Sequence, residues 1–545
     1  MRVGERGKHN KIMKKIIPRK TLLKKALPTA FIFAILGFGL FSYDSNKDFI
    51  NNFQLYHLAS YATMFNVPVI FDSNNSCNLA SVLGAFTGNE NVESLNTEIR
   101  RDSSVPVLLY HGIVLGDDPS NVSLENFKDQ MFVLKKAGWQ TVTIDDFYAF
   151  MKGEKNLPEK SFLLTFDDGR KDSYYPVDPI LKALDYRAIM FVISGRSLGD
   201  EKEVSPFYLS SSELKRMQKS GRWDLQSHGR DDHDFYKINT SGDEGHFLSN
   251  KLWLQDEQRI ETSEEFKTRI YSDFVNSKND LENTFGIKVI SFAFPFGDFG
   301  QNSINFLEAE PIILEAAKAV YSMAFYQVWP GKGFSFNYPA KDSFLIKRID
   351  VKSNWSADNL LKILDIAKEK TLPYNDDFSD YNGWVKTWGK SSLGNNSIVL
   401  SSHASTTGAS IFLDGSYLWD NYSYSANITW VKGRNTSLLA RYKDDENYVA
   451  CNFSGDNVRI EQRLNNKNRV MVEIKNYVNF SKNDLNLGIK VKKDKVECLI
   501  NGNIVAYTYY LSPALSIGGI GFKTWDSQMN NSELIVKNVS VEEIK

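Results

Sequence analysis

The chain has 545 residues, of which 42% are hydrophobic and 13% aromatic, so it can bury substantial cores and is not an intrinsically disordered protein. Its length predicts roughly three domains at the usual size of about 150 residues. The net charge is only −1, but residues 1–25 carry ten Lys or Arg residues against Glu5 alone, which leaves an acidic body. This distribution argues against a nucleic-acid partner.

An apolar stretch follows this basic tail, which we expect to be cytoplasmic. Residues 26–43 are 18 positions without a charge, or about 27 Å of helix, close to the hydrocarbon thickness of a bilayer. Because basic residues precede it and Asp44 and Asp48 follow it, we expect a single-pass transmembrane signal anchor in the cytoplasmic membrane, with the N-terminus inside. A cleaved signal peptide is the alternative. Residues 44–104 are then a predicted stalk or linker.

The three cysteines, Cys77, Cys451 and Cys498, are too few for a disulfide framework or a cysteine-rich zinc site. Cys451 and Cys498 both lie in strand-like runs of the C-terminal part. They either pair outside the cell or remain two buried small hydrophobic residues, and we favour the second interpretation.

From Val105 onward, strand-like and helix-like segments alternate. Periodicity and capping signals predict strands at 105–113, 140–144, 161–166, 187–194, 223–228, 288–297 and 344–351, and helices at 124–137, 177–184, after Ser210 and near 261–285. This order predicts an α/β domain over residues 105–372, a distorted β/α barrel whose active site lies at the C-terminal ends of its strands.

Polar residues stand at these predicted strand ends. His111 ends the first strand, Asp167 and Asp168 end the third, and His228 ends the fifth, with His233 five residues further on. Each alone is also typical of a turn or of a satisfied histidine. Together, one carboxylate and two imidazoles form the ligand set of a catalytic divalent metal, and the second aspartate and third histidine supply a base and an acid.

The motif TFDDG at 165–169, followed by the histidine motif and by FPFG at 294–297, resembles the polysaccharide deacetylases of the carbohydrate esterase 4, or NodB-like, family. The resemblance implies that Asp167 is the catalytic base. It implies that Asp168, His228 and His233 bind a divalent metal, zinc or alternatively nickel, cobalt or iron.

The resemblance also implies an oxyanion or substrate-binding role for the backbone N–H of Phe296, next to Pro295. The chain departs from the usual family pattern, because Ala293 stands where an arginine normally precedes the third motif. In addition, the two metal histidines are five positions apart instead of four, and no histidine lies between Gly297 and Tyr374. The branch that resembles poly-β-1,6-N-acetylglucosamine deacetylases takes its acid from an N-terminal YH motif, which implies His111.

A polar stretch between Asp234 and Glu264 interrupts the domain. Trp253 in this stretch, and Trp329 later, are either exposed platforms for sugar stacking or parts of local cores. We interpret His246 as structural.

Residues 373–545 change to short runs with a period of two, and Asn501-Gly502 is a strong hairpin signal. They predict an all-β jelly-roll sandwich. It looks similar to laminin-G or concanavalin-like domains, which implies carbohydrate binding, with Trp419 and Trp430 as candidate stacking platforms.

These features together predict an extracytoplasmic, membrane-anchored hydrolase. It would remove N-acetyl groups from an amino-sugar polysaccharide such as poly-N-acetylglucosamine, with a divalent metal as cofactor. A peptidoglycan or chitin-like substrate is one alternative. A catalytically silent glycan-binding surface protein is the other.

Overall fold

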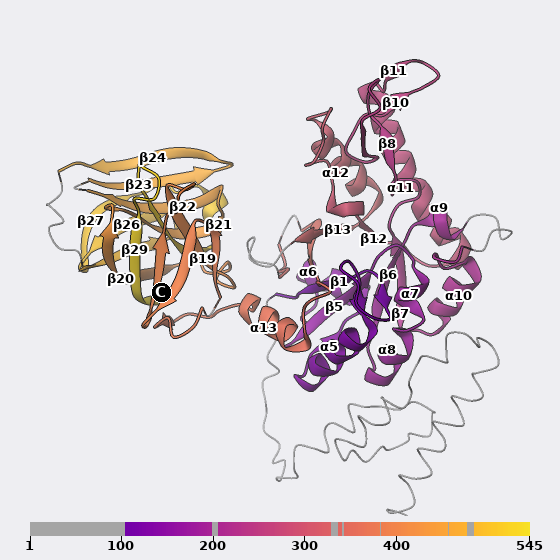
Figure 1. The fold of residues 1–545 in the computed structure, drawn as a ribbon, viewed down its shortest axis with the longest axis horizontal. Coiled ribbons are helices and arrows are strands. Elements are labelled where there is room, and N and C mark those ends of the chain that lie inside the picture. Colours follow the sequence, from indigo (N-terminus) through magenta and orange to yellow (C-terminus); the bar gives the residue numbers. More distant parts are fainter. Residues whose placement is uncertain are drawn as a thin grey trace, which may run out of the picture. The chain divides into compact units, whose positions relative to one another are not determined.

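The computed structural model describes residues 104–198, 205–328, 336–340, 343–381, 383–455, 457–476 and 484–545. The predicted cytoplasmic tail, transmembrane anchor and nearly all of the stalk, as well as Cys77 and Trp329, lie outside the described residues. Within the described ranges, no helix is both long and apolar enough to cross a membrane. The described chain forms an α/β barrel and an all-β sandwich, and each is considered by itself (Figure 1).

Seven parallel strands close the barrel, in the order β1-β14-β13-β12-β7-β6-β5 and back to β1. The short β4 (Gln140–Thr141) pairs with the start of β5. The barrel strands are β1 (Val107–Tyr110), β5 (Ser161–Phe166), β6 (Ala188–Val192), β7 (Trp223–Ser227), β12 (Ser291–Ala293), β13 (Met323–Val328) and β14 (Leu345–Asp350). The predicted β/α barrel is therefore confirmed.

Helices accompany the barrel strands (Figure 1). They are α5 (Leu124–Lys136), α6 (Ile144–Met151), α7 (Lys171–Tyr174), α8 (Asp178–Leu184), α9 (Ser194–Ser197), α10 (Ser211–Lys219), α11 (Ser263–Phe285), α12 (Ala309–Val320) and α13 (Ala357–Ala367). The predicted capping box at Ser210 is present, since its hydroxyl accepts from the Glu213 N–H while Glu213 accepts from the Ser210 N–H.

Two predictions about this domain were wrong. The strand predicted at 140–144 stops at Thr141, because Thr143 caps a new helix by accepting from the Asp146 N–H, and α6 begins at Ile144. The prediction also omitted α12 and β13, which follow each other with only two residues between them. That junction contains no Gly or Pro to mark it.

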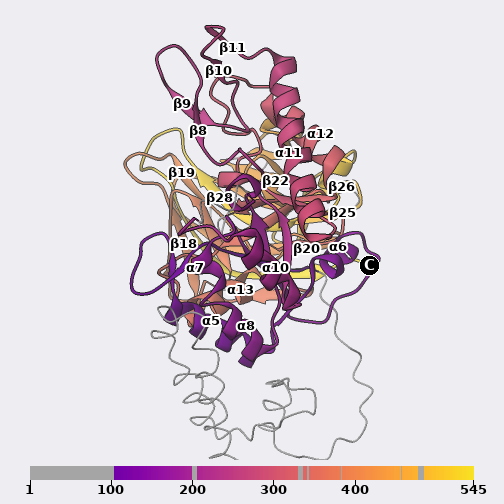
Figure 2. The same ribbon diagram turned by 90° about the vertical axis from the view of Figure 1, so that its right-hand side faces the viewer.

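The polar stretch after β7 forms an arm that runs beside α11 and projects from the barrel (Figures 1 and 2). It contains two small antiparallel pairs, β8 (Phe235–Lys237) with β9 (Glu244–His246), and β10 (Trp253–Leu254) with β11 (Arg259–Ile260). A further short pair, β2 (Ile113–Val114) and β3 (Val122–Ser123), follows β1.

The C-terminal part is a sandwich of two antiparallel sheets, as predicted. One sheet has the order β17-β18-β29-β20-β25-β26-β27 with β15 paired to β29, and the other has the order β16-β19-β28-β21-β22-β23-β24. The strands of the first are β15 (Tyr374–Asp376), β17 (Lys390–Gly394), β18 (Ser397–Ser401), β20 (Tyr422–Lys432), β25 (Asp484–Lys492), β26 (Lys495–Ile500), β27 (Asn503–Thr508) and β29 (Glu533–Glu543). Those of the second are β16 (Trp384–Trp388), β19 (Gly408–Leu413), β21 (Asn435–Asp444), β22 (Asn447–Ser454), β23 (Asn457–Leu464), β24 (Lys467–Ile474) and β28 (Gly519–Trp525). A short 3-10 helix, η3 (Pro513–Leu515), precedes β28.

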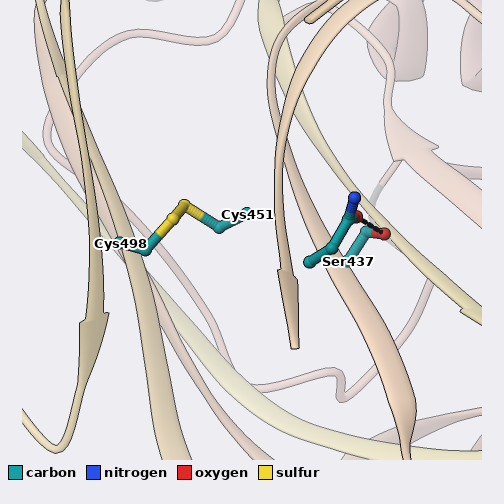
Figure 3. The surroundings of a disulfide bond; sticks show 4 residues. Ser437, Cys451 and Cys498 are labelled. Atoms are coloured by element: carbon teal, nitrogen blue, oxygen red, sulfur yellow. Dashed lines mark hydrogen bonds between the residues drawn. A yellow bond between two sulfur atoms is a disulfide. The ribbon is translucent and has the colours of Figure 1, made fainter. Parts of the chain in front are cut away.

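The sandwich corrects two interpretations of the sequence. Cys451 on β22 and Cys498 on β26 form a disulfide that joins the two sheets, so they are not free buried thiols (Figure 3). Trp419 and Trp430 are 5% and 4% exposed and belong to the core. Neither ring is available for sugar stacking.

Candidate active site and metal centre

The site is built at the C-terminal end of β5, whose six residues are all buried. The register between β1 and β5 pairs Tyr110 with Phe166. The next residue on each strand is therefore His111 on one and Asp167 on the other, and the Asp167 N–H donates to the Tyr110 carbonyl at 3.3 Å. Barrel closure thus brings the first and third predicted strand ends together.

The two aspartates separate because the backbone turns sharply after β5. Asp168 has a φ of 72° and Gly169 a φ of 67°, both in the left-handed region. Such a conformation is costly for an aspartate and is typical of functional sites. Its consequence is that Asp167 remains fully buried inside the barrel end while Asp168 faces the histidines.

Asp168, His228 and His233 form a cluster in which the three potential ligand atoms lie within 4.8 Å of one another. The Asp168 Oδ1 atom is 3.5 Å from His228 Nε2 and 3.1 Å from His233 Nε2. A carboxylate oxygen and two imidazole nitrogens converging on one point are a donor set that suits zinc and neighbouring transition metals.

Neighbouring residues lie beside the Nδ1 atoms of both imidazoles, while the Nε2 atoms face the cluster. The Nδ1–H of His228 donates to the Ala293 carbonyl at 2.7 Å, so the lone pair of Nε2 points at the cluster. Behind His233, its Nδ1 lies 3.9 Å from Oδ1 of the buried Asp232, and neither atom has a hydrogen-bond partner among the described residues. Carboxylate–histidine pairs of this kind are common behind metal ligands.

The electrostatic potential at the cluster favours a cation. Burial raises the pKa of Asp168, but hydrogen bonds and charges from the two histidines outweigh it, and the pKa falls well below the ordinary value. Burial lowers the pKa of His233, yet the Asp168 and Asp232 carboxylates raise it to about 10. The negative field that holds a proton on His233 also stabilises a metal ion between these side chains.

Asp167 has a partner that the sequence did not indicate. Both of its oxygens accept from the guanidinium of Arg348 on β14, with Nη1–Oδ1 at 2.6 Å and Nη2–Oδ2 at 2.8 Å, and both residues are fully buried. The guanidinium also lies over the ring of Phe191, 5.3 Å from its centroid. Arg348 therefore supplies the positive charge that is missing where Ala293 replaces the expected arginine.

Burial raises the pKa of Asp167, but the charge of Arg348, followed by those of His228 and His111, outweighs this effect and leaves the pKa below the ordinary value. The carboxylate is consequently ionised at neutral pH even though it is buried. His111 and Asp167 directly follow the paired residues Tyr110 and Phe166, so the predicted acid and base lie at the ends of adjacent strands.

The Phe296 backbone takes up an unusual conformation just after β12. Within the 3-10 turn η2 (Pro295–Gly297), Phe296 has a φ of 59°, in the left-handed region. The ring of His246 stacks on Phe296 with centroids 4.5 Å apart, and the carboxylate of Asp298 accepts a hydrogen bond from the Nδ1–H of His246. His246 thus contacts Phe296, which is compatible with the structural role predicted for it.

The predicted site residues therefore converge, with His111 and Asp167 on adjacent strands and Asp168, His228 and His233 in one cluster. Phe296 lies against this cluster, its ring 5.5 Å from that of His233. Trp253 is half-buried on β10, where its Nε1–H donates to Gln255. The sequence analysis missed Arg348, Asp232 and the contact of His246.

Part of this chain is similar to known proteins. Residues 154–311 match the family model of polysaccharide deacetylase. A poly-β-1,6-N-acetyl-D-glucosamine N-deacetylase of Escherichia coli K12 is 27% identical over 260 residues, which are 46% of this chain and 36% of that protein. The enzyme of the same name from Staphylococcus aureus MRSA252 is 33% identical over 121 residues, 22% of this chain and 41% of that protein.

Among solved structures, a de-N-acetylase from Aggregatibacter actinomycetemcomitans is 22% identical with a TM-score of 0.42, and the match covers 48% of this chain and all of that one. The chain spans less than half the length of the two curated relatives named above.

Proposed function

We propose that this chain, which carries a polysaccharide deacetylase domain, is a metal-dependent hydrolase that removes N-acetyl groups from an amino-sugar polysaccharide resembling poly-N-acetylglucosamine. One observation carries the proposal: an ionised, buried carboxylate lies next to a three-residue metal cluster and to a histidine on the neighbouring strand. The names of the two N-deacetylases similar to part of the barrel domain support the substrate class.

Asp168, His228 and His233 would hold the metal. A divalent ion held there would lower the pKa of a bound water toward about 7 and polarise a carbonyl group. Two nitrogens and one oxygen as donors support zinc, and they also suit nickel, cobalt or iron.

The remaining residues act on protons and developing charge. Asp167, held in place at both oxygens by Arg348, accepts the proton of the water that attacks the acetamide carbonyl carbon. The backbone N–H of Phe296 is placed in the role of donor to the oxygen on which negative charge develops. His111 then donates a proton to the departing amine, so that acetate and a free amino sugar are released.

An extracytoplasmic location is part of the proposal. The predicted anchor at 26–43 would fix the chain to the cytoplasmic membrane, with the barrel and sandwich outside. The disulfide between Cys451 and Cys498 supports this, since such bonds persist in oxidising compartments.

The proposal is tested by measuring acetate released from N-acetylglucosamine oligomers with β-1,6 or β-1,4 linkages, with and without a chelator. We expect release from the β-1,6 oligomer that stops with chelator and returns when zinc is added. Preferential release from the β-1,4 oligomer would favour a peptidoglycan or chitin-like substrate. No release from either oligomer, with glycan binding retained, would favour a silent binding protein.

Two variants test the assignment of roles. His111→Ala should keep the metal content of the wild type but lose on the order of 10²-fold in turnover, because it removes only the acid. His228→Ala should lose the metal itself, as measured by elemental analysis. Equal metal content and equal residual activity in both variants would contradict the assignment.

A further inference from the structure

Two phenylalanine rings lie exposed beside the candidate metal cluster. Phe296 is 43% exposed, and Phe235, on the arm strand β8, is 54% exposed. Their ring centroids are 5.5 Å apart, and the Phe296 ring is also 5.5 Å from the ring of His233. Single exposed apolar residues need no explanation, but neighbouring ones at the edge of a site are typical of a ligand-binding surface.

The arm holds the Phe235 ring in this place. Phe235 pairs with His246 across β8 and β9, and their ring centroids are 5.0 Å apart. The His246 ring in turn lies nearly parallel to the Phe296 ring, with an angle of 9° between them. Its Nδ1–H donates to the carboxylate of the buried Asp298. Both exposed rings are therefore fixed by the fold itself.

The charges around the hairpin argue against a lipid surface as the ligand of these rings. Residues 231–246 carry five carboxylates against Lys237 alone. Neighbouring Arg196 and Arg230 pair with two of these carboxylates, which still leaves an acidic excess. Anionic lipid headgroups would be repelled by this excess. A neutral polyol is not repelled, because its hydroxyl groups can donate to carboxylates.

The shape of a sugar ring also matches this surface. A pyranose presents C–H bonds on its faces and hydroxyl groups around its edge, so one face can pack on an aromatic ring while the edge keeps its hydrogen bonds. A polysaccharide with one acetamide group at the metal cluster carries further sugar units past the edge of the site. The ring contacts run from His233 to Phe296 and on to Phe235, so Phe235 lies one ring further from the cluster.

From this order we infer that Phe235 is a specificity-determining residue, which stacks on a sugar unit next to the one being deacetylated and so selects chains over short fragments. The inference rests on the proposed function and deepens it, since it adds a substrate contact from the arm. It assigns to Phe235 the stacking role considered for Trp253, which is half-buried on β10.

Acetate release from β-1,6-linked N-acetylglucosamine oligomers of two and five units tests the inference. We expect Phe235→Ala to lower the ratio of kcat/KM for the pentamer to kcat/KM for the dimer by about fivefold to tenfold, as suits the loss of one aromatic contact. The loss for the pentamer should lie in KM and not in kcat. Phe235→Leu should give an intermediate ratio, because it keeps an apolar side chain without a flat ring. Phe235→Trp should keep or raise the wild-type ratio.

Tyr271→Ala is the matched control, because Tyr271 is 48% exposed on α11 and is not part of this ring cluster. It should leave the ratio within about twofold of the wild type. Equal ratios in the wild type, Phe235→Ala and Phe235→Leu would overturn the inference. Weaker binding of anionic phospholipid vesicles by Phe235→Ala, with the ratio unchanged, would show a membrane contact and also overturn it.

Isothermal titration of the metal-free protein with the pentamer separates this result from the barrel's activity. If the proposed deacetylation fails, the wild type should still bind the pentamer more tightly than Phe235→Ala does. If the inference fails, acetate release should remain while the wild type and Phe235→Ala bind the pentamer alike.

Discussion

The pairing of Asp167 with Arg348 sets the ionisation state of the carboxylate that we propose as the catalytic base. Both side chains are fully buried, and two parallel hydrogen bonds fix their relative orientation. Burial alone would raise the pKa of the carboxyl group and leave it protonated at a higher pH. The guanidinium therefore does more than hold the side chain, since it keeps the carboxylate ionised although the side chain is buried.

Replacing Arg348 by Met should leave an unpaired buried carboxylate. We expect a loss of about 3–5 kcal/mol in stability and on the order of 10²-fold in turnover, with the acidic limb of the pH–rate profile moved to higher pH as the pKa of Asp167 rises. Thermal unfolding and a pH profile of acetate release measure these effects.

Arg348→Lys is the control, because it keeps the charge and loses the two-point geometry. Its acidic limb should move less than that of Arg348→Met. If both variants keep the wild-type profile, Arg348 does not set the ionisation of Asp167.

At the scale of elements, α11 holds the loop that carries both metal histidines. The carboxylate of Asp273, buried on α11, accepts from the Arg230 N–H at 3.2 Å and from the Asp231 N–H at 2.9 Å. Burial and then the charge of Asp232 raise the pKa of Asp273, and the two N–H donors oppose this shift. These bonds fix the backbone between His228 and His233.

Asp273→Ala should therefore weaken metal binding by about 10–100-fold, as is typical when a group that supports metal ligands is lost. Competition with a chromophoric chelator measures the affinity. Asp280→Ala on the same helix is the control, because Asp280 accepts from the side chains of Arg230 and Ser194, whereas Asp273 accepts from backbone N–H groups of the loop. Equal affinities in the two variants would show that α11 does not position the loop.

Elements with strong local signals were predictable from the sequence. The sequence predicted the limits of β5, the buried run just before Asp167, close to those in the structure. It did the same for α11, which begins after its N-cap Thr262. In contrast, α12 runs almost directly into β13, so no turn residue separated their apolar residues. The local sequence pattern also did not predict the ion pair of Arg348, because nothing in the sequence of its own strand indicates which side chain it will contact.

The ion pair between Arg348 and Asp167 depends on the closure of the whole barrel. β1 pairs with β5 on one side and with β14 on the other, so the first strand of the barrel joins the third predicted strand to the last. Only this closure brings residues 181 positions apart into one ion pair. Short motifs in the sequence predicted the candidate metal ligands that the structure brings together, but the partner of the proposed base depended on the order of strands.

The sandwich depends on a different long-range connection. Its disulfide joins residues 47 positions apart, on β22 in one sheet and β26 in the other (Figure 3). Closing a loop of that length restricts the unfolded chain and typically stabilises the folded state by about 2–4 kcal/mol. The barrel has a hydrophobic cluster of its own and does not use this bond.

We therefore expect the double variant Cys451→Ala/Cys498→Ala to unfold its sandwich at a lower urea concentration, with acetate release from short oligomers unchanged. A reducing agent should shift the wild type to the same midpoint and leave the double variant where it is, which serves as the control. A wild-type midpoint that does not respond to reduction would mean that packing between the sheets, and not the covalent link, determines the stability of the sandwich.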